Sequence, residues 1–92
     1  MKNGNVTDFI DKLYLGEELL FEYKGYEYFI QGWNEGPKAI MALDRYSNVP
    51  FEEYVWKVEK DKMSECAEAF LNAEIWDNSS FLQIQGEVNW KD

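Results

Sequence analysis

The chain has 92 residues, a net charge of −9, 17% aromatic residues, no histidine and one cysteine. The lack of histidine and of a second cysteine excludes the usual neutral-pH acid–base group, most zinc sites and any intrachain disulfide. The length and the 46% hydrophobic content predict one folded domain, residues 1–92. No apolar run reaches the roughly 18 residues that span a bilayer, and no signal peptide is evident, so we expect a cytoplasmic protein.

The negative charge is concentrated in the second half of the chain. Residues 1–46 contain eight acids and five bases, whereas residues 47–92 contain ten acids and four bases. Because an acidic chain is repelled by nucleic acids and anionic lipids, we expect neither as a direct partner. The charge favours a basic protein surface as the partner.

The N-terminal segment has the apolar spacing of a short amphipathic helix. The apolar stripe comprises Val6, Phe9, Ile10, Leu13 and Tyr14. Asn5 or Thr7 can cap this helix, Asp8 suits its first turn, and Gly16 ends it.

Residues 19–23 and 26–30 flank Lys24-Gly25 and predict a β-hairpin. A two-residue turn places aromatic and aliphatic side chains together on one face, with Phe21 opposite Tyr28. The same register opposes Glu22 and Glu27, a like-charge pair that is unfavourable when exposed. Because lysine is not favoured in the first turn position, a bulged turn with Gly25 in the left-handed region is the alternative.

The middle of the chain predicts a loop and two further strands. Gly32, Asn34, Gly36 and Pro37 mark the loop, with Trp33 inside it. Residues 38–43 form the third strand, and the apolar run 39–43 indicates burial on both sides. Residues 44–50 are rich in turn formers. Residues 54–58 alternate as an edge strand, with a loop as the alternative.

The C-terminal part predicts two helices. A helix from Asp61 buries Met63, Cys66, Ala67, Phe70 and Leu71, and presents Asp61, Glu65, Glu68 and Asn72 on its opposite side. After a turn at 77–78, with Ser79 as the cap, a short helix aligns Phe81, Ile84 and Val88, although Gly86 weakens its end. The expected fold class is α+β: an N-terminal helix, a three- or four-stranded antiparallel β-meander, and two C-terminal helices on one face.

Two stretches of the sequence resemble a group of small, acidic, uncharacterised bacterial α+β proteins. Residues 21–30 match their F-x-Y-x-G-x-x-Y-x-I hairpin, and residues 70–77 are similar to their helix end and following turn. The resemblance covers about a fifth of the chain, supports the same layout and implies no activity. In size, charge and element order, the chain is also similar to small phage-encoded inhibitors of host nucleases and to toxin-immunity proteins.

The motifs of common catalytic and cofactor sites are absent from the sequence. The acid pairs at 17–18 and 52–53 are expected to be solvated, because neighbours on a strand point to opposite faces. Asp44 with Glu52, Glu53, Glu59 or Asp61 lacks the spacing of a calcium loop, so we expect no metal. Cys66 lies on an apolar stripe without a histidine to activate it and is expected in the core. We expect no cofactor and no catalytic residues.

These observations favour a non-enzymatic acidic binding protein, most concretely an inhibitor or immunity-type protein that covers a basic, nucleic-acid-binding site of its partner. The expected partner-binding residues are Asp61, Glu65, Glu68, Glu52 and Glu53, with Trp33 or Trp56 as the anchor. Trp33 and Trp90 are the tryptophans expected to be exposed. The alternatives are a homodimer without ligand, paired through the edge strand 54–58, and a carboxylate-based enzyme with two acids in a cleft.

Overall fold

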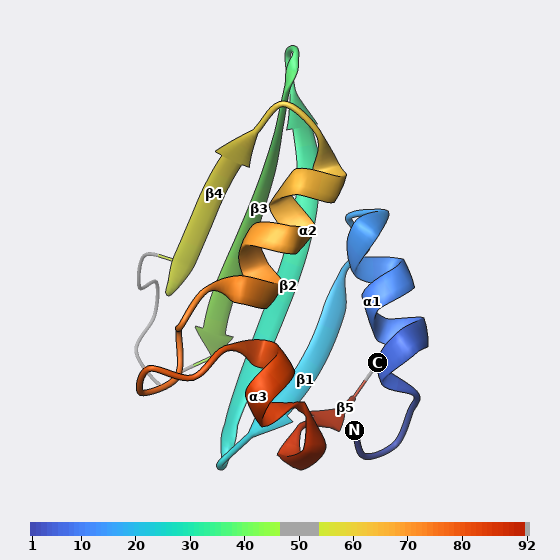
Figure 1. Ribbon diagram of the computed structural model, residues 1–92, viewed down its shortest axis with the longest axis vertical. Coiled ribbons are helices and arrows are strands. Elements are labelled where there is room, and N and C mark those ends of the chain that lie inside the picture. Colours follow the sequence, from blue (N-terminus) through green and yellow to red (C-terminus); the bar gives the residue numbers. More distant parts are fainter. Residues whose placement is uncertain (47–53, 92) are drawn as a thin grey trace.

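The computed structural model describes residues 1–46 and 54–91. Its elements are α1 (Val6–Tyr14), β1 (Leu19–Tyr23), β2 (Tyr26–Glu35), β3 (Lys38–Tyr46), β4 (Trp56–Lys60), α2 (Met63–Asn72), α3 (Phe81–Ile84), the 3-10 helix η1 (Gln85–Glu87) and β5 (Asn89–Trp90). The strands form one antiparallel sheet in the order β4-β3-β2-β1-β5. The helices lie on one face of it (Figure 1). The α+β prediction is therefore confirmed, with five strands instead of three or four.

Helix α1 forms as its apolar spacing predicts. Asn5 is the N-cap, and its side-chain oxygen accepts a hydrogen bond of 2.7 Å from the backbone N–H of Thr7. Phe9 and Leu13 are fully buried. Gly16 follows the helix with φ +74°, a conformation that favours glycine over residues with a side chain.

The β1–β2 hairpin has the predicted register. Phe21 pairs with Tyr28, and Glu22 lies opposite Glu27. Lys24 and Gly25 both have positive φ, 50° and 81°, as a two-residue type I′ turn requires. The pairing continues without a bulge up to this turn, so the bulged alternative is wrong.

The prediction that Trp33 lies in a loop is wrong. Strand β2 continues to Glu35, Trp33 pairs with Ile40, and the turn is confined to Gly36-Pro37. Gly32 does not form a turn; it lets strand β2 pack closely against Gly16 and Met63. Its N–H donates to the carbonyl of Gly16, and a Cβ atom on Gly32 would lie 2.6 Å from Met63 Sδ.

Strand β3 is buried on both sides, as its continuous apolar run predicts. Each residue from 39 to 43 has at most 2% of its surface exposed. The strand extends through Asp44 to Tyr46, where turn formers had been expected, and residues 47–50 of that predicted turn lie outside the described residues. Strand β4 is confirmed at the sheet edge, displaced by two residues from the predicted 54–58.

The C-terminal elements differ in detail from the prediction. Helix α2 begins at Met63, so Asp61 precedes it. Asp77 and Asn78 both have positive φ in the expected turn, but Ser80 caps α3 in a capping box with Gln83. The predicted last helix gives way to η1 and then to β5, which pairs with β1. A two-residue strand has no periodicity from which it could be predicted.

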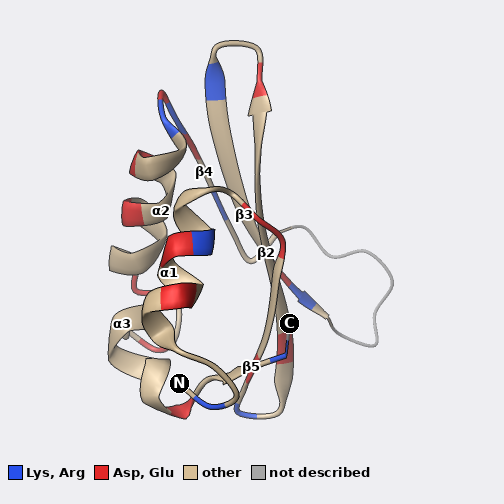
Figure 2. Ribbon diagram, turned by 90° about the vertical axis from the view of Figure 1, so that its right-hand side faces the viewer, with Lys and Arg blue, Asp and Glu red and all other residues tan. Residues whose placement is uncertain are grey.

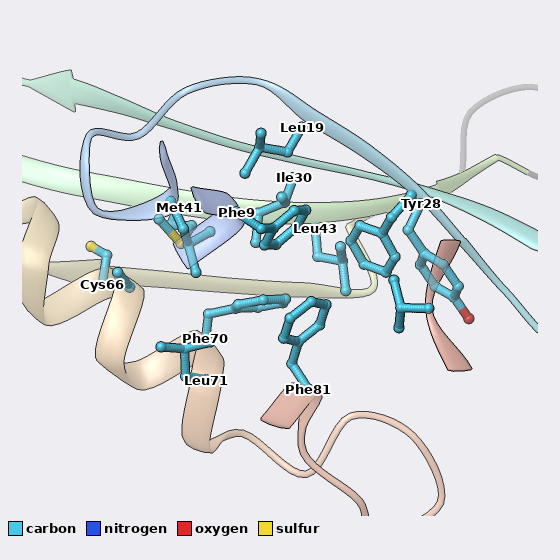
Figure 3. Packing of buried hydrophobic residues seen from close by; sticks show 14 of the residues in the cluster. Phe9, Leu19, Tyr28, Ile30, Met41, Leu43, Cys66, Phe70, Leu71 and Phe81 are labelled. Atoms are coloured by element: carbon cyan, nitrogen blue, oxygen red, sulfur yellow. The ribbon is translucent and has the colours of Figure 1, made fainter. Parts of the chain in front are cut away.

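Aromatic rings dominate the core between the sheet and the helices (Figure 3). Phe9, Phe21, Phe70 and Phe81 are fully buried, and the Phe9 and Phe81 rings stack with centroids 5.0 Å apart. Cys66 is buried in the same core, as predicted, and its Sγ donates to the carbonyl of Ala39. Burial raises the pKa of the Cys66 thiol, which disfavours the nucleophilic thiolate.

Candidate partner-binding surface

Among the residues that the structure describes, one face of the sheet carries no helix. In Figure 2 the three helices lie on one side of the strands, and we call the opposite surface the open face. Because side chains alternate along a strand, the pairing register assigns the residues of this face. From β1 to β4 they are Leu20, Glu22, Glu27, Phe29, Gln31, Trp33, Glu35, Lys38, Ile40, Ala42, Asp44, Tyr46, Lys57 and Glu59. Ile40 and Ala42 point to this side but are buried.

Apolar and acidic side chains adjoin one another on the open face. Phe29 lies between Leu20 and Asp44 across three strands, and Glu27 lies between Glu22 and Tyr46. The rings of Phe29 and Tyr46 are 6.4 Å apart, and 56% of the Tyr46 surface is exposed. This end of the face therefore combines accessible aromatic surface with carboxylates.

A second aromatic pair lies near the β4 edge. The Trp33 and Tyr54 rings are 6.4 Å apart, and Lys57 Nζ lies 5.8 Å from the Trp33 centroid and 5.3 Å from that of Tyr54. Both distances are within the range of cation–π attraction. These two rings already hold a cation of their own chain, which indicates that they suit an ammonium or guanidinium group.

The open face has an excess of negative charge. Its acids are Glu22, Glu27, Glu35, Asp44 and Glu59, and its bases are Lys38 and Lys57. Lys38 donates to Asp61 Oδ1, so its charge is already matched. Burial raises the pKa of Asp44, the carboxyl next to Phe29.

Of the acids predicted for one stripe of α2, Glu65 and Glu68 lie on the helix and Asp61 does not. Asp61 lies before the helix and pairs with Lys38 of β3. Glu65 is exposed, and Glu68 accepts a hydrogen bond of 3.4 Å from the Tyr14 hydroxyl of α1. Glu65 and Glu68 therefore belong to the helical layer, and the regular spacing inferred from Asp61 onward is wrong.

The three tryptophans considered as contact residues differ in their surroundings. Trp33 is half-buried on the open face, on the opposite side of the sheet from Glu65 and Glu68 of the helical layer. Trp56 packs on Phe70 with ring centroids 5.6 Å apart, so its ring lies on the side of the sheet that faces the core. Trp90, which was expected to be exposed, is half-buried with its ring edge-on to Phe9. Glu52 and Glu53 lie outside the described residues.

Sequence reasoning missed four open-face residues: Glu22, Glu27, Phe29 and Tyr46. The available signal was the opposed pair of glutamates in the hairpin. Such a pair is unfavourable for folding. Two neighbouring carboxylates also create a negative potential that attracts positively charged groups.

A shallow pocket of about 290 Å³ lies at the turn end of the sheet, on the helical side. Tyr23, Tyr28 and Trp76 line it, and the Arg45 guanidinium lies 4.9 Å above the Tyr26 ring. Among the described residues, the pocket contains one carboxylate, from Asp77.

Comparison of the chain with protein-family models, curated proteins and solved structures gives no match. Within residues 1–46 and 54–91, no three side chains of the His, Cys, Asp and Glu types cluster as metal ligands would. Each described helix is too short or too polar to cross a bilayer.

Replacement of Lys38 by methionine is expected to raise the pKa of Asp61 toward its ordinary value. The hydrogen bond and charge of Lys38 hold the Asp61 pKa below that value. A lowered pKa means that the pair contributes stability above the unfolded-state pKa and loses it as pH falls through the folded-state pKa. Carboxyl chemical shifts followed by NMR from neutral to acidic pH measure the change, and identical titration of Asp61 in both proteins would contradict the pairing.

Proposed function

We propose that this protein is a non-enzymatic binding protein that covers a basic surface of a partner protein with its open face. The observation that supports this most is the coincidence of aromatic and carboxylate side chains on the open face, which none of the described helices covers. Aromatic side chains are enriched among the residues that anchor protein interfaces. The carboxylates beside them would attract a basic partner and orient it.

The open face suits this role better than the helical layer. On the open face, Glu22 and Glu27 lie directly opposite each other, with Phe29 and Tyr46 alongside. On the helical layer, Glu68 already accepts a hydrogen bond from Tyr14, and Trp56 packs inward on Phe70. On the open face, by contrast, the exposed Tyr46 ring lies directly opposite the Glu27 carboxylate in the sheet register.

The most concrete form of the proposal is an inhibitor or immunity-type protein that acts in the cytoplasm. Nucleic-acid-binding sites of proteins are basic, and an acidic face of this kind would compete with the phosphate backbone for such a site. The binding would be sensitive to salt, because the Debye length falls to about 8 Å at physiological ionic strength.

Two charge-matched double variants test which surface binds. We expect Glu22→Gln/Glu27→Gln to weaken binding of a deca-arginine peptide by about 3- to 10-fold at low salt, since each exposed ion pair contributes up to about 1 kcal/mol. The control, Glu65→Gln/Glu68→Gln, has the same net charge and should bind as tightly as the wild type. Fluorescence titration of a labelled peptide, repeated at two salt concentrations, gives the affinities.

The same titration followed by NMR locates the contact. We expect amide shift changes at Phe29, Trp33 and Tyr46 of the open face. An equal loss of affinity in the two double variants, or shift changes confined to α1 and α2, would overturn the proposal. Affinity that does not change with salt would overturn its electrostatic part.

A further inference from the structure

The two edges of the sheet are different. At one edge, β5 pairs with β1, and Lys2 then pairs with Asn89 of β5 through hydrogen bonds from Lys2 N to Val88 O and from Trp90 N to Lys2 O. At the other edge, β4 pairs with β3 on one side only (Figure 1). No other strand in the described part of the chain lies beside it. A strand with one unpaired edge is a template for pairing with another chain.

The charges of β4 complement one another when the strand is paired with itself. Its sequence from Trp56 to Lys60 is Trp-Lys-Val-Glu-Lys. In an antiparallel pair of two such strands with Val58 opposite its own copy, Lys57 lies opposite Glu59 of the partner subunit. By symmetry the same pair forms twice. Unlike charges directly opposite each other stabilise antiparallel strands.

The neighbouring registers do not have this property. Because side chains alternate, a pairing that keeps the two open faces on the same side must be centred on a residue of β4. A pair centred on Lys57 opposes two lysines, and a pair centred on Glu59 opposes two glutamates. Of these three registers, the one centred on Val58 is the one without a like-charge pair at the centre.

We propose that this protein forms a homodimer in which β4 pairs antiparallel with β4 of a second copy, centred on Val58. The edge carries two lysines and one glutamate, so each β4 strand is close to neutral although the whole chain has a net charge of −9. Lys57 and Glu59 are exposed, and in the dimer the Lys57 ammonium would exchange its contact with the Trp33 and Tyr54 rings for Glu59 of the partner subunit.

The pairing would make one continuous sheet from the two five-stranded sheets. A two-fold axis normal to the sheet keeps both open faces on the same side and both helical layers on the other. The dimer would therefore double the surface that we propose for a basic partner. The pairing itself does not depend on that proposed function, since it involves only the edge of β4.

Charge reversal at the two central positions tests the register. Lys57→Glu places glutamate opposite Glu59 in both halves of the pair, and Glu59→Lys places lysine opposite Lys57. We expect each single variant to weaken dimerisation at least 10-fold. An equimolar mixture of the two variants restores both unlike pairs in a heterodimer, and the double variant Lys57→Glu/Glu59→Lys restores them in a homodimer.

Sedimentation equilibrium at low salt over a range of concentrations measures the association. The wild type, the mixture and the double variant should approach twice the monomer mass of 10.9 kDa, while each single variant alone stays near that mass. Glu65→Lys, which changes net charge as Glu59→Lys does but lies on α2, should leave the dimer intact. Circular dichroism establishes that each variant is folded.

Two results would overturn the proposal. The first is a wild-type protein that keeps the monomer mass up to millimolar concentration. The second is a dimer whose stability does not recover in the folded double variant or in the mixture, because recovery is the signature of the Val58-centred register. Neither result bears on binding of deca-arginine to the open face, so this proposal and the proposed function fail separately.

Discussion

Replacement of Phe21 by alanine is expected to destabilise the protein by about 3–5 kcal/mol, the usual cost of removing a fully buried aromatic side chain. Phe21 has no exposed surface, and its ring centroid lies between 5.2 and 6.2 Å from those of Phe9, Tyr28, Trp76 and Phe81. It joins the sheet to α1 and α3, so the cavity would open at the centre of the core. Urea denaturation followed by circular dichroism measures the loss.

Tyr46→Ala is the matched control for this change. Tyr46 is also an aromatic residue in a strand, but more than half of its surface is exposed. Its replacement should change the free energy of unfolding by less than about 1 kcal/mol, since exposed positions have small effects. Comparable losses in the two variants would mean that the aromatic cluster does not carry the stability we assign to it.

Replacement of Gly16 by valine is expected to cost about 2–5 kcal/mol. The residue has φ +74°, where a side chain costs about 1–2 kcal/mol. A Cβ atom would also lie 2.9 Å from Met63 Cε, and overpacking of this kind costs about 1–3 kcal/mol. Urea denaturation of the wild type and the variant gives the difference.

Gly25→Val separates the two contributions. Gly25 has a similar φ of +81°, but nothing lies within 4 Å of a Cβ atom built on it. Its replacement should show the backbone cost alone. In a Met63→Ala background, the excess cost at Gly16 should shrink toward the Gly25 value. Equal costs at the two glycines in the wild-type background would refute the close contact with Met63.

The sequence was sufficient for the elements in which side-chain periodicity is strong. The apolar stripe around Phe9 predicted α1, and the alternation around Phe21 predicted the hairpin with its register. The same reasoning failed at Trp33, because glycine marks both turns and places where two backbones approach closely. Gly32 is of the second kind, and its partner, Gly16, lies elsewhere in the chain.

The candidate surface was predictable in chemistry but not in location. Composition alone indicated carboxylates with a few aromatic residues. Helical periodicity then predicted Glu65 and Glu68 as contact residues, because the spacing of residues on one helix face can be read directly from the sequence. The open face arises from strands paired through the sheet register, so Glu22, Glu27 and Tyr46 become neighbours only once the pairing is known.

The junction between the N-terminal segment and β5 has a consequence for the order of folding. Turns of two residues join β1 to β2 and β2 to β3, so these pairs can form by local encounters. By contrast, Asn3 and Asn89 are hydrogen-bonded across 86 positions. The entropy lost on closing a loop grows with its length. The contact between the two ends of the chain therefore costs less entropy once the β-meander has already formed. It is expected to form last and to open first, so among the hydrogen-bonded amides of the sheet those of Lys2 and Trp90 should have the least protection from hydrogen exchange.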